Sequence, residues 1–300
     1  MIAGEHGVSA ACEALGVSRS GYYDRATREP SKRSAEDAEL ADVIEEIYRD
    51  NRCVYGCPRI ELALRLQGRG HGKLRIARLM KERGLKGRSR GRFKPFLTHS
   101  EHQFGYSRNL LGKMDFPKLA HQVWVSDTTF IKTDQGWIYL AVTMDLHSRY
   151  VVGWKVSPLN DSELTACALE KAAKEHSATG LLHHSDRGST YASGRFMASL
   201  KELQAVSSMS RKGNCYDNAE MESFFGTLKA ECVQGISYRD LEQAHQSLFS
   251  YIEGFYNTRR LHTSIEMTPL QKLQQSLDEQ AGSTARDAAE SGDARRSPNP

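Results

Sequence analysis

The sequence predicts an α/β domain preceded by a smaller, all-α and strongly basic region. Apolar, β-prone runs at 123–131, 137–144 and 150–156 are followed by alternating helical and strand-like patterns. Before residue 90 the pattern is helical and interrupted by glycines, and Lys and Arg are concentrated between residues 52 and 118. A chain of 300 residues, 39% of them hydrophobic, has room for one domain of about 150 residues and smaller modules.

Residues 1–50 are predicted to form helix-turn-helix-like helices. Gly16 can adopt the left-handed conformation that ends a helix, and Ser18 can cap the next one. This order is typical of a helix-turn-helix, although an ordinary corner between two helices is the alternative. An amphipathic helix from residue 36 to residue 48 follows, with its apolar residues on one stripe.

Residues 51–96 are predicted to form a basic helical DNA-binding module. Pro58 is placed where the first turn of a helix tolerates proline, Gly68 and Gly70 end that helix, and a second helix covers 73–83. From residue 52 to residue 118 the chain has 17 Lys and Arg against four Asp and Glu, a net charge of +13. Such a concentration of cations predicts contact with a polyanion. The candidate DNA-binding residues here are Arg59, Arg75, Arg78, Lys81, Arg88, Arg90 and Arg92.

Residues 97–120 are predicted to be a linker, and residues 121–278 the catalytic domain with its C-terminal helix. Three strand patterns precede a helix at 161–175, for which Asp161 is the expected cap. Strand, helix, strand and helix patterns follow. Residues 279–300 are rich in Ala, Gly, Ser, Asp and Arg and are predicted to be a disordered tail.

Three acids stand on different predicted elements of this domain. Asp127 interrupts the first apolar run, Asp186 ends a short strand pattern, and Glu222 lies within a helical pattern. A carboxylate inside a strand costs free energy unless it binds something positive. Three converging carboxylates supply the hard oxygen ligands that Mg²⁺ and Mn²⁺ prefer, so we expect a metal site.

The sequence motifs around these acids are specific in their order and spacing. Asp127 and Asp186 are separated by 58 residues, and Asp186 and Glu222 by 35. These motifs are Val123–Phe130, His184–Ser189, Ser208–Ala219, Glu222–Phe225 and Tyr256–His262. From about residue 7 to about residue 275, the sequence resembles the superfamily of DDE transposases and retroviral integrases. More narrowly, it resembles the OrfB catalytic subunit of bacterial insertion sequences that encode their transposase in two overlapping frames.

The resemblance implies a ribonuclease H-like integrase catalytic core, with a five-stranded mixed sheet flanked by helices. It implies that Asp127, Asp186 and Glu222 are a catalytic triad that holds two Mg²⁺ (or Mn²⁺) ions, cuts DNA at its 3′ ends and transfers the strand. The implied partners are double-stranded DNA at the terminal repeats, target DNA, further copies of the chain on DNA, and the upstream-frame protein. No apolar run is long enough to cross a membrane, so we expect a bacterial cytoplasmic protein associated with the nucleoid.

Further cations can be assigned near the acids. Lys229 follows Glu222 by seven residues, which places it on the same helix face two turns away. The family has a basic residue at this position, where it can hold a DNA phosphate. In the later box, Arg260 and His262 suit phosphate contact, or they lock the terminal helix against the core. The sequence leaves both alternatives open.

Two other functions compete with transposition. One is a hydrolytic ribonuclease H-like nuclease, against which the basic amino-terminal region argues, because it indicates directed binding to DNA. The other is a catalytically silent DNA-binding repressor derived from a transposable element. The presence of all three acids and of Lys229 argues against a silent protein.

Overall fold

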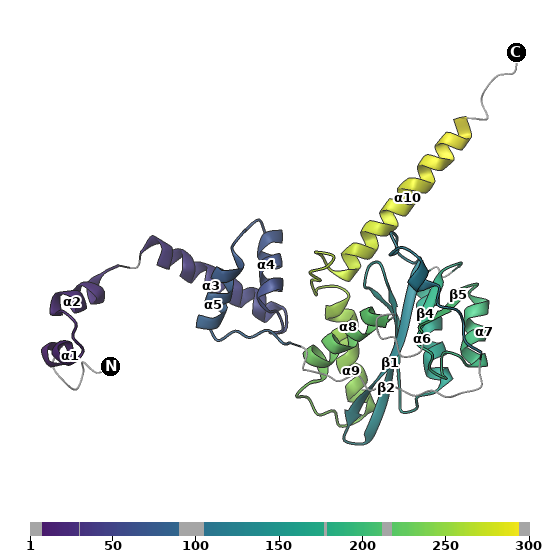
Figure 1. Cartoon of the computed structure of the whole chain (residues 1–300), viewed down its shortest axis with the longest axis horizontal. Helices are drawn as coiled ribbons and strands as arrows, with labels where there is room; N and C mark the ends of the chain where they lie inside the picture. Colours follow the sequence, from purple (N-terminus) through teal and green to yellow (C-terminus); the bar gives the residue numbers. More distant parts are fainter. Residues whose placement is uncertain (1–7, 30, 90–104, 177–178, 212–217, 294–300) are drawn as a thin grey trace, which may run out of the picture.

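The predicted fold class is confirmed: an α/β domain with a five-stranded mixed sheet follows an all-α region (Figure 1). The computed structural model describes residues 8–29, 31–89, 105–176, 179–211 and 218–293, with side chains as far as residue 283. Within these residues no helix is both long and apolar enough to span a membrane.

The first two helices lie where the sequence predicts a helix, a glycine turn and a second helix. Helix α1 spans Val8–Ala14 and α2 spans Arg19–Thr27. Gly16 between them has a φ of +62°, a conformation that costs glycine little. Ser18 caps α2, because its side-chain oxygen accepts a hydrogen bond from the backbone N–H of Gly21. The pair lies at the end of the molecule farthest from the α/β domain (Figure 1).

The next three helices share one core, whereas the sequence placed a domain boundary at residue 50, within this group. Helix α3 spans Lys32–Asp50, α4 spans Cys57–Leu66, and α5 spans Lys73–Glu82. The buried side chains of Ile44, Ile60 and Ile76 each come from a different helix of this group. The apolar stripe of α3 is buried against α4 and α5, which makes residues 32–82 a single unit.

The sheet has the order β3-β2-β1-β4-β5. Its first three strands are antiparallel, whereas β4 and β5 run parallel to β1. The strands are β1 (Val123–Thr133), β2 (Gly136–Asp145), β3 (Val151–Ser157), β4 (Leu182–Ser185) and β5 (Val206–Met209). The flanking helices are α6 (Ser162–Glu175), α7 (Gly194–Glu202), α8 (Ala219–Leu228) and α9 (Leu241–Tyr251).

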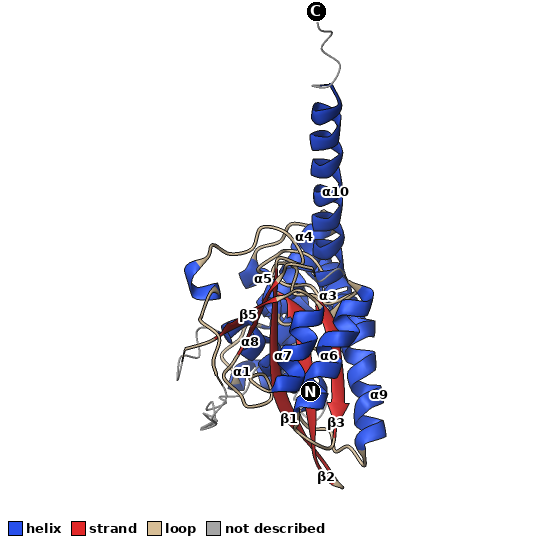
Figure 2. Ribbon diagram, turned by 90° about the vertical axis from the view of Figure 1, so that its right-hand side faces the viewer, coloured by secondary structure: helices blue, strands red, loops and turns tan. Residues whose placement is uncertain are grey.

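Successive residues of β1 face opposite layers of helices, as the twofold period of a strand requires. Val125 belongs to the apolar cluster that contains Phe224 of α8, whereas Trp124 belongs to the cluster of Phe196 on α7. The sheet is therefore covered on one side by α6 and α7 and on the other by α8 and α9 (Figure 2).

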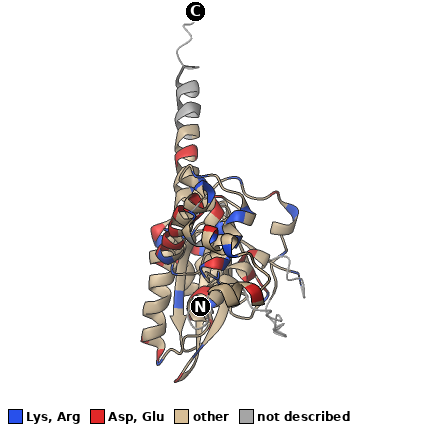
Figure 3. Cartoon of the chain, turned by 90° about the vertical axis from the view of Figure 1, so that its left-hand side faces the viewer, with Lys and Arg blue, Asp and Glu red and all other residues tan. Residues whose placement is uncertain are grey.

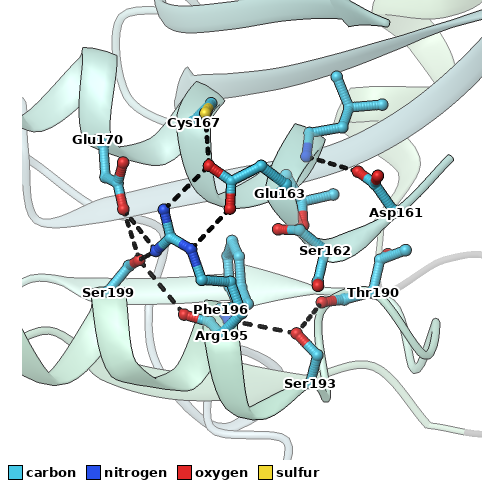
Figure 4. A network of polar contacts seen from close by, with 12 residues as sticks. Asp161, Ser162, Glu163, Cys167, Glu170, Thr190, Ser193, Arg195, Phe196 and Ser199 are labelled. Atoms are coloured by element: carbon cyan, nitrogen blue, oxygen red, sulfur yellow. Dashed lines mark hydrogen bonds and ion pairs between the residues drawn. The ribbon is translucent and has the colours of Figure 1, made fainter. Parts of the chain in front are cut away.

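Helices α6 and α7 are also joined by charged groups at the surface of their layer (Figure 4). Arg195 of α7 donates to Glu163 over 2.8 Å and to Glu170 over 2.6 Å, both on α6. Ser193 caps α7 and accepts from the backbone N–H of Phe196. One arginine thus fixes the two helices relative to each other with charge-assisted bonds.

The segment predicted as a linker is attached to the sheet edge over its described part. It contains a short helical turn, η2 (Leu111–Lys113). The backbone N–H of Leu110 donates to the Ser208 hydroxyl on β5 over 2.9 Å, and the hydroxyls of Ser107 and Ser207 lie 2.8 Å apart. This part of the chain lies beside β5 and is held there by side chains of that strand.

The C-terminal elements are η4 (Lys229–Val233), η5 (Ile252–Tyr256) and α10 (Pro269–Asp293). The predicted disordered tail is wrong for residues 279–293, which continue α10 beyond the domain (Figures 1 and 2). Composition misled here because alanine, abundant in this stretch, also has the highest helix propensity. Residues 294–300 lie outside the described residues.

We expect Gly153→Ala to destabilise the α/β domain. A Cβ at Gly153 of β3 would lie 2.3 Å from the carbonyl oxygen of Ala168 and 2.8 Å from the Cβ of Ala172, both on α6. The helix must move away, which costs about 1–3 kcal/mol. Urea denaturation measures the free energy of unfolding. Gly194→Ala is the matched control, because nothing lies within 4 Å of its Cβ position; equal stability of the two variants would contradict this packing.

Candidate active site

Two of the three predicted acids lie beside each other where β4 ends alongside the middle of β1. Strand β4 pairs in parallel with β1, and its last pair joins Ser185 to Ser126. Asp186 and Asp127 each occupy the next position along their strand. Because paired strands are about 4.8 Å apart, the topology brings these two carboxylates to one place.

Each of these aspartates also has a fixed backbone donor. The N–H of Thr128 donates to Asp127 Oδ1 over 2.8 Å, and the N–H of Gly188 donates to Asp186 Oδ1 over 2.8 Å. Burial raises the pKa of the Asp127 carboxyl well above its ordinary value, and the charges of Asp186 and Glu222 raise it further. Burial likewise raises the pKa of Asp186.

Glu222 and Lys229 approach this place from α8 and its continuation, η4. Glu222 is exposed, and partial desolvation raises the pKa of its carboxyl. The Lys229 ammonium lies 4.8 Å from the centre of the Phe130 ring on β1. Burial lowers the pKa of Lys229, while the charge of Asp127 acts in the opposite direction. The charges of Asp186, Glu222 and Lys229 therefore all act on Asp127.

The donor set suits a hard divalent cation, but it does not form a finished cage. Within the residues that the structure describes, no three Asp, Glu, His or Cys side chains stand close enough to hold a metal ion together. Asp127, however, is destabilised as an anion by both of the other acids. A cation placed among these oxygens would reverse that repulsion, so the residues present are compatible with Mg²⁺ or Mn²⁺.

Behind Asp127, the sheet is stiffened by a buried polar cluster. The Ser126 hydroxyl lies 2.8 Å from the Thr143 hydroxyl and 2.8 Å from Nε2 of His183. Burial, and the neighbouring His184, lower the pKa of His183 to about 3, so this imidazole is neutral at physiological pH. These groups link β1, β2 and β4 directly beneath the two aspartates.

Two of the arginines predicted to contact DNA are instead paired within the helical unit. Arg75 Nε donates to Asp37 over 2.6 Å and Arg78 Nη2 over 2.5 Å, so one aspartate of α3 binds both. Arg83 makes the same kind of pair with Asp42. Cationic and acidic segments are accordingly intermixed on the face that carries the N-terminal helices (Figure 3). DNA contact by Arg75 and Arg78 stays a prediction, in which a phosphate would compete with Asp37 for both side chains.

Two further predicted DNA-binding residues face the catalytic domain. Arg59 Nε donates to the carbonyl of Leu261 over 3.2 Å, and Arg88 Nη1 donates to the carbonyl of Gln234 over 3.2 Å. Both arginines connect the helical unit to the catalytic domain. Lys81 is exposed, which leaves it accessible to a polyanion. The predicted residues Arg90 and Arg92 lie outside the described residues.

Arg260 and His262 pack within the protein in this structure, which favours the packing alternative that the sequence left open. Arg260 is 1% exposed and donates twice to the buried carboxylate of Glu231, over 2.8 Å each time. His262 Nε2 lies 3.1 Å from Arg260 Nη1, and burial lowers its pKa well below the ordinary value. The Arg260 guanidinium is enclosed and paired in this structure, so its DNA contact stays a prediction that its burial does not favour.

Sequence reasoning missed Glu231 and the exposed aromatic pair of Phe130 and Trp137. Glu231 had a detectable signal, because it stands among Leu228, Ala230 and Cys232 in an apolar helical stretch and must therefore have a cationic partner. Phe130 and Trp137 had no such signal in the sequence, because aromatic side chains on alternating strands commonly face a core.

Comparison with known proteins first defines the class of the fold. The pattern of the integrase core domain matches residues 117–215 and, in a second part, residues 222–277. The pattern of an HTH-like domain matches residues 34–93, which contain α3, α4 and α5. The chain thus combines a helix-turn-helix-like unit with an integrase core, an association that implies DNA binding.

Relatives along nearly the whole chain then define the family. The sequence is 38% identical over 255 residues to the insertion element IS600 uncharacterized 31 kDa protein of Shigella sonnei, covering 85% of this chain and 93% of that protein. It is 36% identical over 262 residues to transposase InsF for insertion sequence IS3A of Escherichia coli (strain K12), covering 86% and 91%. The chain belongs to the insertion-sequence transposases of the OrfB type.

Solved structures with a similar arrangement are more distant. One is the simian T-cell lymphotropic virus intasome in complex with PP2A regulatory subunit B56 gamma, with 16% identity, a TM-score of 0.45 and coverage of 77% of this chain and 74% of that chain. Another is the HTLV-2 integrase catalytic core domain in complex with magnesium, with 18% identity, a TM-score of 0.38 and coverage of 52% and 98%.

We expect Asp127→Asn to stabilise the metal-free protein at neutral and alkaline pH. The pKa of Asp127 is raised on folding above the value of about 3.9 in the unfolded chain. The penalty is therefore absent below pH 4 and grows as the pH rises towards the folded pKa. Thermal denaturation in EDTA should show a gain of about 2–4 °C at pH 8 and none at pH 4. The exposed Asp134→Asn serves as control, and a gain that does not depend on pH would refute this origin.

We expect Arg260→Met to destabilise the protein by about 3–5 kcal/mol, because it leaves the Glu231 carboxylate buried without its partner. Urea denaturation gives the difference. Arg65→Met removes an exposed pair with Glu266 and should cost less than about 1 kcal/mol. Adding Glu231→Gln to Arg260→Met should recover part of the loss. Equal losses in the free energy of unfolding for the two arginine variants would show that the buried pair stabilises the protein no more than the exposed pair.

Proposed function

We propose that this protein catalyses Mg²⁺- or Mn²⁺-dependent DNA cleavage at the 3′ ends of its insertion sequence and joins those ends to target DNA. The observation that carries the proposal is the adjacency of Asp127, within β1, and Asp186, just beyond the end of β4, with the charge of Glu222 on α8 acting on Asp127. Membership of the transposase family supports the same reaction class.

In this proposal the three acids hold the metal ions and the protein forms no covalent bond to DNA. Two divalent ions, when bound, polarise the phosphodiester and activate water or a 3′-hydroxyl. Asp127 occupies the central position, because both other acids act on it. The Ser126 hydroxyl is buried and engaged with Thr143 and His183, which argues against a serine nucleophile.

Lys229 is proposed to hold the phosphate of the DNA end. Its ammonium lies beside β1 at Phe130, and it interacts with the charge of Asp127. A cation in this position attracts the phosphate and places it next to the acids, which is a positioning effect rather than a chemical step. Tyr191, whose hydroxyl lies 3.1 Å from that of Thr128, has a pKa raised by burial and by Asp127, so it stays a neutral phenol.

The proposed partners follow from the two parts of the chain. The HTH-like unit would bind double-stranded DNA at the terminal repeats, with Lys81, Arg90 and Arg92 as phosphate contacts, and the catalytic core would then engage target DNA. Several copies of the chain would assemble on the two ends, together with the upstream-frame protein where the frames are fused. We place this activity in the bacterial cytoplasm, at the nucleoid.

We expect Glu222→Gln to reduce strand cleavage and joining at least about 100-fold while end binding changes little. The substitution preserves the volume of the side chain but removes a negative ligand, so the metal pair is held poorly. Lys229→Ala should instead raise the DNA concentration needed for half-maximal rate, because it weakens the hold on the phosphate. The assay is strand transfer with DNA from the flanks of the gene, on intact and pre-nicked ends.

Glu220→Gln is the matched control, since Glu220 shares the first turn of α8 but lies 3.5 Å from Arg149. It should retain activity. Wild-type rates in Glu222→Gln on a pre-nicked end would show that Glu222 is not the third ligand. Binding of the ends without cleavage by the wild-type protein in Mg²⁺ and Mn²⁺ would support the silent repressor, and hydrolysis without joining would support the nuclease.

A further inference from the structure

Two aromatic side chains lie exposed together on the β1–β2 hairpin. Phe130 is 44% exposed and Trp137 is 52% exposed, and their rings meet edge to face with centroids 5.1 Å apart. The other two tryptophans, Trp124 and Trp154, are 0% and 2% exposed. The hairpin extends past the ends of α6 and α7 (Figure 2). A large aromatic pair left in water at this point indicates a binding surface rather than a core.

Phe130 lies three residues beyond Asp127 on β1, on the opposite face of the strand but close to the candidate active site. Strand β4 pairs with β1 only as far as Ser126, so the edge of β1 beside Phe130 is not covered by a described strand. Lys229 lies across this edge, with its ammonium 4.8 Å from the Phe130 ring and its charge acting on Asp127. One cation therefore connects the aromatic pair with the acids.

A second cation completes the surface. Lys132 is exposed and stands directly opposite Trp137 in the register of β1 and β2. Strand alternation places Lys132 on the same face as Phe130. Exposed rings offer a face to any nucleic-acid base, and flanking cations attract its phosphates. The combination of two rings and two lysines is the chemistry that binds a single nucleic-acid strand.

We propose that Phe130 and Trp137 form a stacking platform for an unpaired base of the DNA strand next to the phosphate that is cut or joined. The proposal rests on the proposed function and adds a subsite to it. A base within a duplex keeps its faces covered by its neighbours and cannot stack on a side chain. The platform therefore selects an end whose last bases are opened, and holds that strand near Asp127.

A second copy of the chain is the competing occupant of this surface. A symmetric contact between two copies brings the same patch of each together. Lys132 and Lys229 of both copies would then face each other, and this like-charge repulsion disfavours the contact. A polyanionic strand instead neutralises both lysines, so the charges favour DNA.

Intrinsic fluorescence of the full chain in EDTA tests the proposal without any catalysis. Because Trp137 is exposed and the other two tryptophans are buried, a stacked base quenches mainly Trp137. We expect quenching by a short oligothymidylate and by a flanking-DNA duplex with a 3′ overhang, and little by the same duplex with blunt ends. Trp137→Phe should bind the overhang duplex as the wild type does but lose the quench.

Trp137→Ala should weaken binding of the overhang duplex by about 5- to 100-fold and leave blunt-duplex binding unchanged. Phe249→Ala is the matched control, because Phe249 is 54% exposed on α9 and stacks near Trp154 instead. Equal quenching by blunt ends, wild-type affinity in Trp137→Ala, or a change in Trp137 emission with protein concentration alone would each overturn the platform. A chain that stacks the overhang yet never cleaves would refute only the proposed function.

Discussion

The arrangement of the molecule depends on the buried ion pair between Glu231 and Arg260. Glu231 lies on η4, which continues α8, so it is fixed two residues beyond Lys229 on the helix that carries Glu222. Arg260 comes from the chain segment that leads into α10. Arg59 of α4 reaches the same carboxylate from the helical unit, at 3.8 Å. One buried acid thereby joins the helical unit of residues 32–82, the helix that carries Glu222 and the C-terminal segment.

The buried ion pair fixes one end of the helix whose other end lies at the electrostatically unfavourable site of Asp127. Burial and the charges of Asp186 and Glu222 raise the pKa of Asp127, so the ionised form of Asp127 is unfavourable in the metal-free fold. One of these charges, Glu222, is carried by α8. The paired and hydrogen-bonded groups of Glu231, Arg260 and Tyr251 anchor its far end. Stability provided at one end of the helix thus tolerates repulsion at the other.

The sequence predicted the fold class and the strands, because these follow from local patterns. Apolar alternation defines β1 and β2, and the parallel pairing of β4 with β1 places Asp186 beside Asp127. It could not predict that α3 packs with α4 and α5, because an apolar stripe on a helix does not identify the element against which it is buried. It also misjudged residues 279–293, where polarity indicated disorder and helix propensity prevailed.

The assignment of cations shows why charge along a sequence is a poor guide to charge in space. The stretch from residue 52 to residue 118 has a large excess of Lys and Arg. This net charge leaves out the acids of α3, which precede the stretch in the sequence. In the fold, Asp37 and Asp42 of α3 pair with Arg75 and Arg78 of α5 and with Arg83, which follows it. A phosphate must compete with these carboxylates for the same guanidinium groups. The field that DNA meets is therefore smaller than the composition suggests, and exposed lysines such as Lys81 and Lys132 carry a larger share of it.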